Sequence, residues 1–225
     1  MFDLVKRENI IFKILEKFTN NNLKFVIVGG YAVSAYKHRF SIDADIIIKK
    51  EEIKKFEEIL KKNKFKKTII KKLEHIYASE FVRYESKDKP PASIDILING
   101  IGSRTTKASF SFEQIEKHSK KRKIIGTEKE VTLSVPDKEV LIALKIHSGR
   151  LTDFRDIVAL CNDIKIEIIK EYVRIGDQEI LKNNINTLLN LIEKKEFIKS
   201  FKGVFKEKKY DININEVKKL NCSFS

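Results

Sequence analysis

Two aspartates and a glycine turn are the residues of this sequence best suited to chemistry. Gly29 and Gly30 come directly after the apolar run 25–28, an order that predicts a strand, a turn and a short helix. Backbone N–H groups at such a turn point outward, so the turn can hold a phosphate. Asp43 and Asp45 stand two apart in a second predicted strand, and their side chains therefore leave the same face. Paired carboxylates beside a phosphate site indicate Mg²⁺ held against a nucleoside triphosphate, and hence nucleotidyl transfer.

A third aspartate, Asp95, stands within the apolar segment 93–98. A carboxylate is expensive to bury there unless it is paired or binds a cation. Three carboxylates on neighbouring strands could hold two divalent ions, one activating the attacking hydroxyl and one neutralising the triphosphate and the leaving pyrophosphate. Asp43 and Asp45 would then be the shared ligands, and Asp95 would complete one site and help deprotonate the acceptor. The alternative is that Asp95 caps a turn or faces solvent on an edge strand.

Two residues between the glycine turn and the carboxylates are candidate nucleotide contacts. Ser34 lies one turn into the predicted helix, where its hydroxyl could reach a phosphate or serve as a small packing group. Arg39 precedes Asp43 by four residues and could reach a phosphate or form a simple ion pair with that aspartate. The two glycines also have a structural explanation, because a tight turn favours residues that tolerate positive φ.

A second cluster of charged residues lies further along the chain. Lys145 ends a predicted helix at the border of its apolar face, from which it could project into a cleft and grip the β- and γ-phosphates. Asp153 and Asp156 share one face at the start of the next predicted helix, where the helix dipole alone also favours carboxylates. Arg150 and Arg155 could contact an acceptor or pair with these two aspartates.

The charge of the chain favours a polyanionic partner. Among 225 residues, Lys and Arg exceed Asp and Glu by 14, an excess that suits RNA, DNA or nucleotides. The segment 49–72 carries eleven lysines against four glutamates, and a second basic run spans 117–123. Either run could dock a nucleic-acid backbone, although solvated surface is the default explanation of such runs.

The cysteines and the hydropathy of the sequence indicate the cellular compartment. Cys161 and Cys222 form no metal-spaced pair and do not predict a disulfide scaffold, which fits a reducing cytoplasm. No apolar run approaches the roughly 20 residues of a membrane span, and the first residues do not resemble a signal peptide. We therefore expect a cytoplasmic protein with no membrane partner.

Periodicity predicts an α/β region followed by a helical one. In the first region we expect helices at 3–19, 31–37, 51–62 and 112–119, strands at 24–28, 43–48, 66–77, 79–85 and 93–98, a loop at 99–109, and one or two strands within 123–135. In the second we expect helices at 137–147, 152–162, 165–175 and 177–199. These elements predict a core at 1–135, a helical domain at 136–205, and a polar tail at 206–225 that docks loosely.

The two charged clusters together resemble a known family. Gly29-Gly30 through Arg39-x-Ser41-x-Asp43-x-Asp45 looks like the first motif of the DNA polymerase β-like nucleotidyltransferase superfamily. The pattern Lys145…Arg150-x-x-Asp153-x-x-Asp156 resembles the later motif of its AbiEii/AbiGii-toxin-like branch, which includes toxins of type IV toxin–antitoxin systems. The resemblance spans roughly residues 24–160. Two positions depart from the pattern: Ser41 stands where Thr is frequent, and Thr152 where Lys or Arg is frequent.

The resemblance implies an α/β fold in which a mixed-sheet nucleotidyltransferase core is flanked by helices and followed by an α-helical C-terminal region that closes over a cleft. It implies Mg²⁺-dependent transfer of a nucleoside monophosphate from a nucleoside triphosphate such as ATP, with two Mg²⁺ ions or Mn²⁺ in their place. By position, Asp43, Asp45 and Asp95 would be the metal ligands. Gly29, Gly30, Ser34, Arg39 and Lys145 would bind the nucleotide, and Asp153 would have a catalytic or structural role.

The acceptor and the partners stay open at this point. Superfamily members use tRNA ends, proteins and small antibiotics, and the net charge favours RNA, with tRNA foremost, over a small molecule. A toxin of this branch would also have a cognate antitoxin. The alternative is a nucleic-acid-binding or toxin–antitoxin partner protein that keeps the fold without catalysis, which the intact set of three carboxylates disfavours.

Overall fold

A mixed sheet forms the centre of the first half of the protein. The computed structural model describes residues 2–71, 80–205 and 212–224. The five strands are β1 (Phe25–Val28), β2 (Asp43–Ile48), β3 (Lys66–Lys71), β4 (Phe81–Glu85) and β5 (Ser93–Ile98). They lie in the order β1-β2-β5-β4-β3, with β2 and β5 parallel and the other neighbours antiparallel. This arrangement confirms the predicted mixed α/β class.

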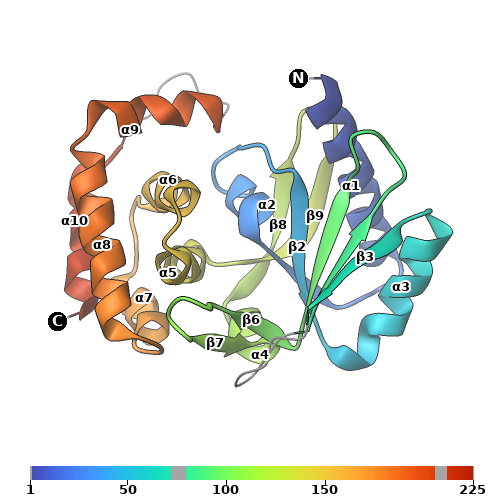
Figure 1. The fold of residues 1–225 in the computed structure, drawn as a ribbon, viewed down its shortest axis with the longest axis horizontal. Coiled ribbons are helices and arrows are strands. Elements are labelled where there is room, and N and C mark those ends of the chain that lie inside the picture. Colours follow the sequence, from blue (N-terminus) through green and yellow to red (C-terminus); the bar gives the residue numbers. More distant parts are fainter. Residues whose placement is uncertain (1, 72–79, 206–211, 225) are drawn as a thin grey trace.

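Helices cover both faces of this sheet (Figure 1). On one face lie α1 (Phe2–Asn20) and α3 (Ile53–Lys62), the latter preceded by the short helix η1 (Lys50–Glu52). Phe18 of α1 packs edge-on against Phe25 and Phe56, with ring centroids 5.8 and 4.8 Å apart, and so joins both helices to the sheet. On the other face lies α2 (Gly29–Ser34), on the side of the helical second half.

Two small hairpins follow the sheet. The first pairs β6 (Gly100–Gly102) with β7 (Ser109–Ser111), and α4 (Phe112–Lys117) then leads to the second, β8 (Ser119–Ile125) with β9 (Glu130–Pro136). The predicted loop at 99–109 is therefore wrong where these short strands lie. A Cβ atom on Gly100 would come within 2.3 Å of the Phe110 carbonyl oxygen, so the pairing depends on a close backbone approach that apolar periodicity does not reveal.

Helices dominate the second half, as expected. They are α5 (Lys138–Ser148), α6 (Leu151–Leu160), α7 (Ile166–Val173), α8 (Gln178–Ile192), α9 (Lys195–Lys199) and α10 (Ile214–Lys219), with the short helices η2 (Ser200–Gly203) and η3 (Leu220–Phe224). Gly149, at φ +65°, ends α5 in the left-handed conformation typical of a helix C-terminus. Figure 1 shows α5 and α6 between the sheet region and α8.

Two expectations need correction, and a third is tested only in part. The predicted helix 177–199 is interrupted at Lys194, whose extended backbone separates α8 from α9 and lets Phe197 pack against Phe201. The predicted strands at 66–77 and 79–85 are β3 and β4, and residues 72–79 lie outside the described part. The tail does not dock loosely where it is described, because Val217 and Leu220 are buried in the core. The boundaries of the predicted domains stay predictions.

Two further properties concern the cysteines and the lengths of the helices. Cys161 and Cys222 are both free thiols, and burial raises the pKa of Cys161 well above its usual range. Among the described residues, every helix is too short or too polar to cross a bilayer.

Candidate active site

The three predicted carboxylates converge because of the register of the central strands. Asp45 of β2 pairs with Asp95 of β5. Asp43 precedes Asp45 by two positions on the same strand. On the other side of β5, Arg83 of β4 also pairs with Asp95. Directly paired residues of neighbouring strands project from the same face. Asp45, Asp95 and Arg83 therefore form one row across three strands, with Asp43 beside it.

Arg83 is the residue of this site that sequence analysis missed. Its Nε and Nη2 atoms donate to the two oxygens of Asp95 at 2.7 and 2.6 Å, and Nη2 also donates to Asp43 at 3.2 Å. The alternation in β4, where Val82 and Tyr84 are buried and Arg83 is not, places Arg83 on the opposite face. The alternation within β4 does not reveal which strand lies next to β4, and so it does not reveal the partner of Arg83.

The glycine turn lies directly against one of the carboxylates. Gly29 has φ +65°, and a Cβ atom there would lie 2.0 Å from Oδ2 of Asp45. A Cβ atom on Gly30 would lie 2.4 Å from Oγ of Ser41. Both glycines are therefore needed for close approach to the segment that carries the aspartates, in addition to the turn itself.

A cavity of about 490 Å³ opens in front of Asp45. Its charged and glycine lining comes from Gly29, Asp45, Gly102, Arg104, Lys145, Arg150 and Asp153. Its apolar lining comes from Val28, Phe81, Leu97, Ile101, Phe110, Leu141 and Leu144. The cavity is thus walled by the sheet, the β6–β7 hairpin and the helices α5 and α6. Four of the predicted site residues line it, whereas Gly30, Ser34, Arg39, Asp43 and Asp95 do not.

Burial and mutual repulsion raise the pKa of two aspartates of the carboxylate cluster. Burial, together with the charges of Asp43 and Asp95, raises the pKa of Asp45 to about 7, although Lys145 and Arg150 oppose the shift. Burial also raises the pKa of Asp95, with Asp43 adding to the shift and Arg83 opposing it. A site of this kind favours an additional cation next to Asp45.

Both the donor type and the charge of this cluster fit a divalent cation. Carboxylate oxygens are the ligands that Mg²⁺ prefers, and here Asp43 and Asp45 of β2 lie beside Asp95 of β5. The present side-chain positions do not yet surround an ion. Within the described ranges no three acidic, histidine or cysteine side chains are arranged around a common metal position. Arg83 instead bridges Asp43 and Asp95.

The second charged cluster is an ion-pair network between α5 and α6, in which Lys145, Asp153 and Asp156 are buried and Arg150 is exposed. Nζ of Lys145 lies 3.0 Å from Oδ1 of Asp153 and 2.6 Å from Oδ2 of Asp156. Arg150 donates to Asp153 at 2.7 Å, and Arg39 pairs with Asp156. Although burial opposes it, Lys145 and Arg150 hold the pKa of Asp153 below its ordinary value. Lys145 and Arg150 thus line the cavity, both paired with Asp153, and Lys145 is paired with Asp156 as well.

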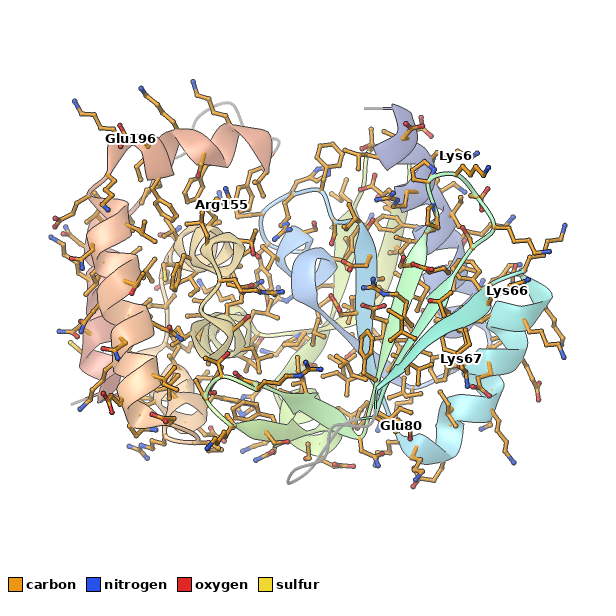
Figure 2. The ribbon with its side chains drawn as sticks, in the orientation of Figure 1. Lys6, Lys66, Lys67, Glu80, Arg155 and Glu196 are labelled. Carbon is orange, nitrogen blue, oxygen red and sulfur yellow. The ribbon has the colours of Figure 1, made fainter. Side chains whose placement is uncertain are left out.

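Two predicted nucleotide contacts have structural partners in this arrangement. Arg39 pairs with Asp156 and not with Asp43 as the ion-pair alternative supposed. The Ser34 hydroxyl donates to the Arg39 carbonyl oxygen at 2.7 Å and closes the loop after α2. Arg155 stands apart from the network, and its buried Nε atom has no hydrogen-bond partner within the described residues. Figure 2 shows Arg155 between α6 and α9.

His147 fixes the β6–β7 hairpin that walls the cavity. Its Nδ1 lies 2.7 Å from the Thr106 hydroxyl, and its Nε2 lies 3.2 Å from the Tyr172 carbonyl oxygen. The Ser103 hydroxyl donates to the His147 carbonyl oxygen at 2.8 Å. Burial lowers the pKa of His147 to about 4, so the ring is neutral near pH 7. A neutral ring that accepts from Thr106 donates to Tyr172 through Nε2.

The lysine-rich segment lies away from the cavity. Lys66 and Lys67 of β3 are exposed, and Figure 2 shows them on the side of the sheet away from α5 and α6. Lys67 pairs with Glu57 of α3 at 2.7 Å. The basic residues that line the cavity are instead Arg104, Lys145 and Arg150.

Most of the sequence matches a known protein family. Residues 13–207 match the AbiEii family, described as nucleotidyl transferase AbiEii toxin of a type IV toxin–antitoxin system. This range contains every residue of both charged clusters. No curated protein matches the sequence.

Three solved structures resemble the fold. A putative nucleotidyltransferase from H. pylori shares 14% identity over 99% of this chain and 93% of its own, with a TM-score of 0.49. The antibiotic-resistance factor ANT(2'')-Ia shares 15% over 82% and 94%, with a TM-score of 0.48. The lincosamide antibiotic adenylyltransferase LnuA, with lincomycin bound, shares 21% over 68% and 95%, with a TM-score of 0.45.

Proposed function

The chain belongs to the AbiEii family of nucleotidyl transferase toxins, and we propose that it moves a nucleoside monophosphate from a nucleoside triphosphate to a hydroxyl of RNA, with Mg²⁺ bound by Asp43, Asp45 and Asp95. The observation that carries the proposal is the row of carboxylates on β2 and β5 at the edge of a cavity walled by Gly29, Lys145 and Arg150. Asp45, Lys145 and Arg150 line the same cavity, so a ligand of the metal and two ligands of the phosphates would share one space.

Different residues of the cavity would bind the triphosphate and the base of the nucleotide. Lys145 and Arg150 would contact the triphosphate, and Asp153 holds both cations in position. The backbone of Gly29 gives a phosphate close access to Asp45, because no side chain intervenes. The apolar half of the cavity, with Leu141 among its residues, would take the base.

The chemistry joins the acceptor oxygen to the α-phosphorus. The bond between the α-phosphorus and the bridging oxygen breaks, pyrophosphate leaves, and the hydroxyl proton passes to Asp45, the carboxylate of the three that lines the cavity. When bound, Mg²⁺ would neutralise the triphosphate and the departing pyrophosphate. Asp43 and Asp45 would orient the reacting groups, and the helices α5 and α6 would exclude water from the far side of the cavity.

RNA, and tRNA in particular, is the proposed acceptor because of charge. The excess of 14 basic residues suits a polyanion, and binding to it would release counterions. The family description adds a toxin–antitoxin context, and we propose that a cognate antitoxin restrains the activity. A protein hydroxyl is the competing acceptor, which the assay below distinguishes.

The test is transfer of an α-³²P-labelled nucleotide in the presence of total RNA, with each nucleoside triphosphate in turn. We expect label in an RNA band of tRNA size, dependent on Mg²⁺ and abolished by a chelator. Label that resists ribonuclease and moves with protein would overturn the RNA acceptor. Transfer that continues in the chelator would overturn the metal requirement.

A further inference from the structure

Arg83 occupies a position that the proposed reaction does not explain. Its guanidinium lies between two of the three proposed metal ligands, 2.6 Å from Asp95 and 3.2 Å from Asp43. Asp95 is buried, whereas the side chains of Asp43 and Arg83 are each 28% exposed. A cation of fixed charge therefore stands at the solvent-facing side of the carboxylate row.

The two contacts of Arg83 are unequal. Asp95 accepts two short hydrogen bonds from Nε and Nη2, the bidentate geometry in which arginine binds a carboxylate most strongly. Asp43 accepts one longer bond from Nη2, which is shared with Asp95. The contact to Asp43 is thus the weaker of the two and the one that can break while Arg83 stays in place.

Lys145 and Arg150 of the site already have carboxylate partners on α6. Lys145 pairs with Asp153 and Asp156, and Arg150 pairs with Asp153. In the described part of the chain, the ion pairs of Asp43 and Asp95 are both with Arg83. Neutralisation of Asp43 therefore depends on Arg83 until another cation arrives.

We propose that Arg83 is a positioning residue that competes with the divalent cation: it holds Asp43 and Asp95 in the metal-free protein and must release Asp43 before a metal binds. This inference rests on the proposed metal site. A guanidinium already paired with two of the ligands lowers the affinity for a second cation, because their like charges repel and Asp43 must exchange partners. Arg83 thereby occupies the carboxylates of the metal-free protein and sets the metal concentration at which the site assembles.

The test measures Mn²⁺ binding directly, from the electron paramagnetic resonance signal of the free ion. Arg83→Gln removes the charge and keeps a polar side chain, and we expect Mn²⁺ to bind about tenfold tighter than to the wild type. Arg83→Lys keeps the charge without the planar fork that spans both carboxylates, and we expect about threefold tighter binding. Arg122→Gln is the matched control, because Arg122 is also a part-exposed arginine paired with an aspartate, Asp137.

The outcomes separate this inference from the proposed function. Wild-type protein that binds Mn²⁺ as tightly as Arg83→Gln would overturn the competition and leave the metal site standing. Failure of wild type and both Arg83 variants to bind Mn²⁺ would overturn the metal site and the competition together. Thermal melting with and without Mn²⁺ shows which variants fold, and Mn²⁺ should stabilise Arg83→Gln more than the wild type. If Arg83→Gln does not fold, unchanged affinity in Arg83→Lys overturns the inference.

Discussion

Gly29 and Asp45 are in such close contact that any side chain at position 29 would meet the carboxylate: a Cβ atom would lie 2.0 Å from Oδ2. The backbone at Gly29 also has φ +65°, a conformation that L side chains rarely adopt. The turn after β1 and the carboxylate on β2 are thus fitted to each other, and a change at one moves the other.

Gly29→Ala should therefore lose both stability and activity. We expect about 1–3 kcal/mol of destabilisation from the strained backbone and a loss of nucleotidyl transfer from displacement of Asp45. Urea unfolding and the transfer assay measure the two effects. Gly176→Ala is the control, because Gly176 also has positive φ, and its Cβ atom would meet Thr106 instead of the carboxylates. Equal losses of activity in both variants would contradict a specific link between Gly29 and Asp45.

The buried network should make Asp156 important for stability. Asp156→Asn leaves the buried Lys145 with one partner fewer and Arg39 without its carboxylate, so we expect about 3–5 kcal/mol of destabilisation. The control Glu130→Gln breaks an exposed pair with Lys123 and should cost less than about 1 kcal/mol. Urea unfolding of both variants checks the difference. Similar values for the two would show that the network contributes little.

His147 should make the protein less stable in mild acid. Its pKa is about 4 in the folded protein, against about 6.5 in the unfolded chain. Below pH 6.5 the unfolded state binds the proton more readily, so stability falls as the pH falls from 6.5 to 4, by about 3 kcal/mol in total. The measurement is the free energy of unfolding against pH for wild type and His147→Gln. Parallel curves for the two proteins would disprove the assignment.

The basic residue that meets the acceptor should be Arg104 of the cavity wall and not Lys66 of the lysine-rich segment. Arg104→Gln should weaken RNA binding and reduce the salt dependence of the binding constant by roughly one counterion. Lys66→Gln removes the same charge from the far side of the sheet and should leave both unchanged. Filter binding over a range of salt concentrations distinguishes them. A larger effect at Lys66 would move the RNA surface to the face of β3.

Local pattern predicted the strands that carry the carboxylates. The segments 43–48 and 93–98 are apolar runs with isolated aspartates, and β2 and β5 have these same bounds. The pairing of Arg39 with Asp156 could not be predicted, because the partners are 117 residues apart and meet only when α6 lies beside the segment that follows α2. Arg83 was missed for a related reason: strand alternation gives its face, whereas the register of β4 against β5 decides its partner. The three-residue strands β6 and β7 are too short to show periodicity.

The central claim is that the carboxylates of β2 and β5 support nucleotidyl transfer, and the most direct test compares the initial rates of label transfer by wild type, Asp45→Asn and Asp88→Asn. Asp88 pairs with Lys6 at the surface and serves as the matched control. The account predicts a loss of about 100-fold or more for Asp45→Asn with a wild-type rate for Asp88→Asn. Asp88→Asn should melt at the wild-type temperature, and Asp45→Asn should melt no lower, because folding disfavours the charged form of Asp45. A wild-type transfer rate in a folded Asp45→Asn protein would contradict the account.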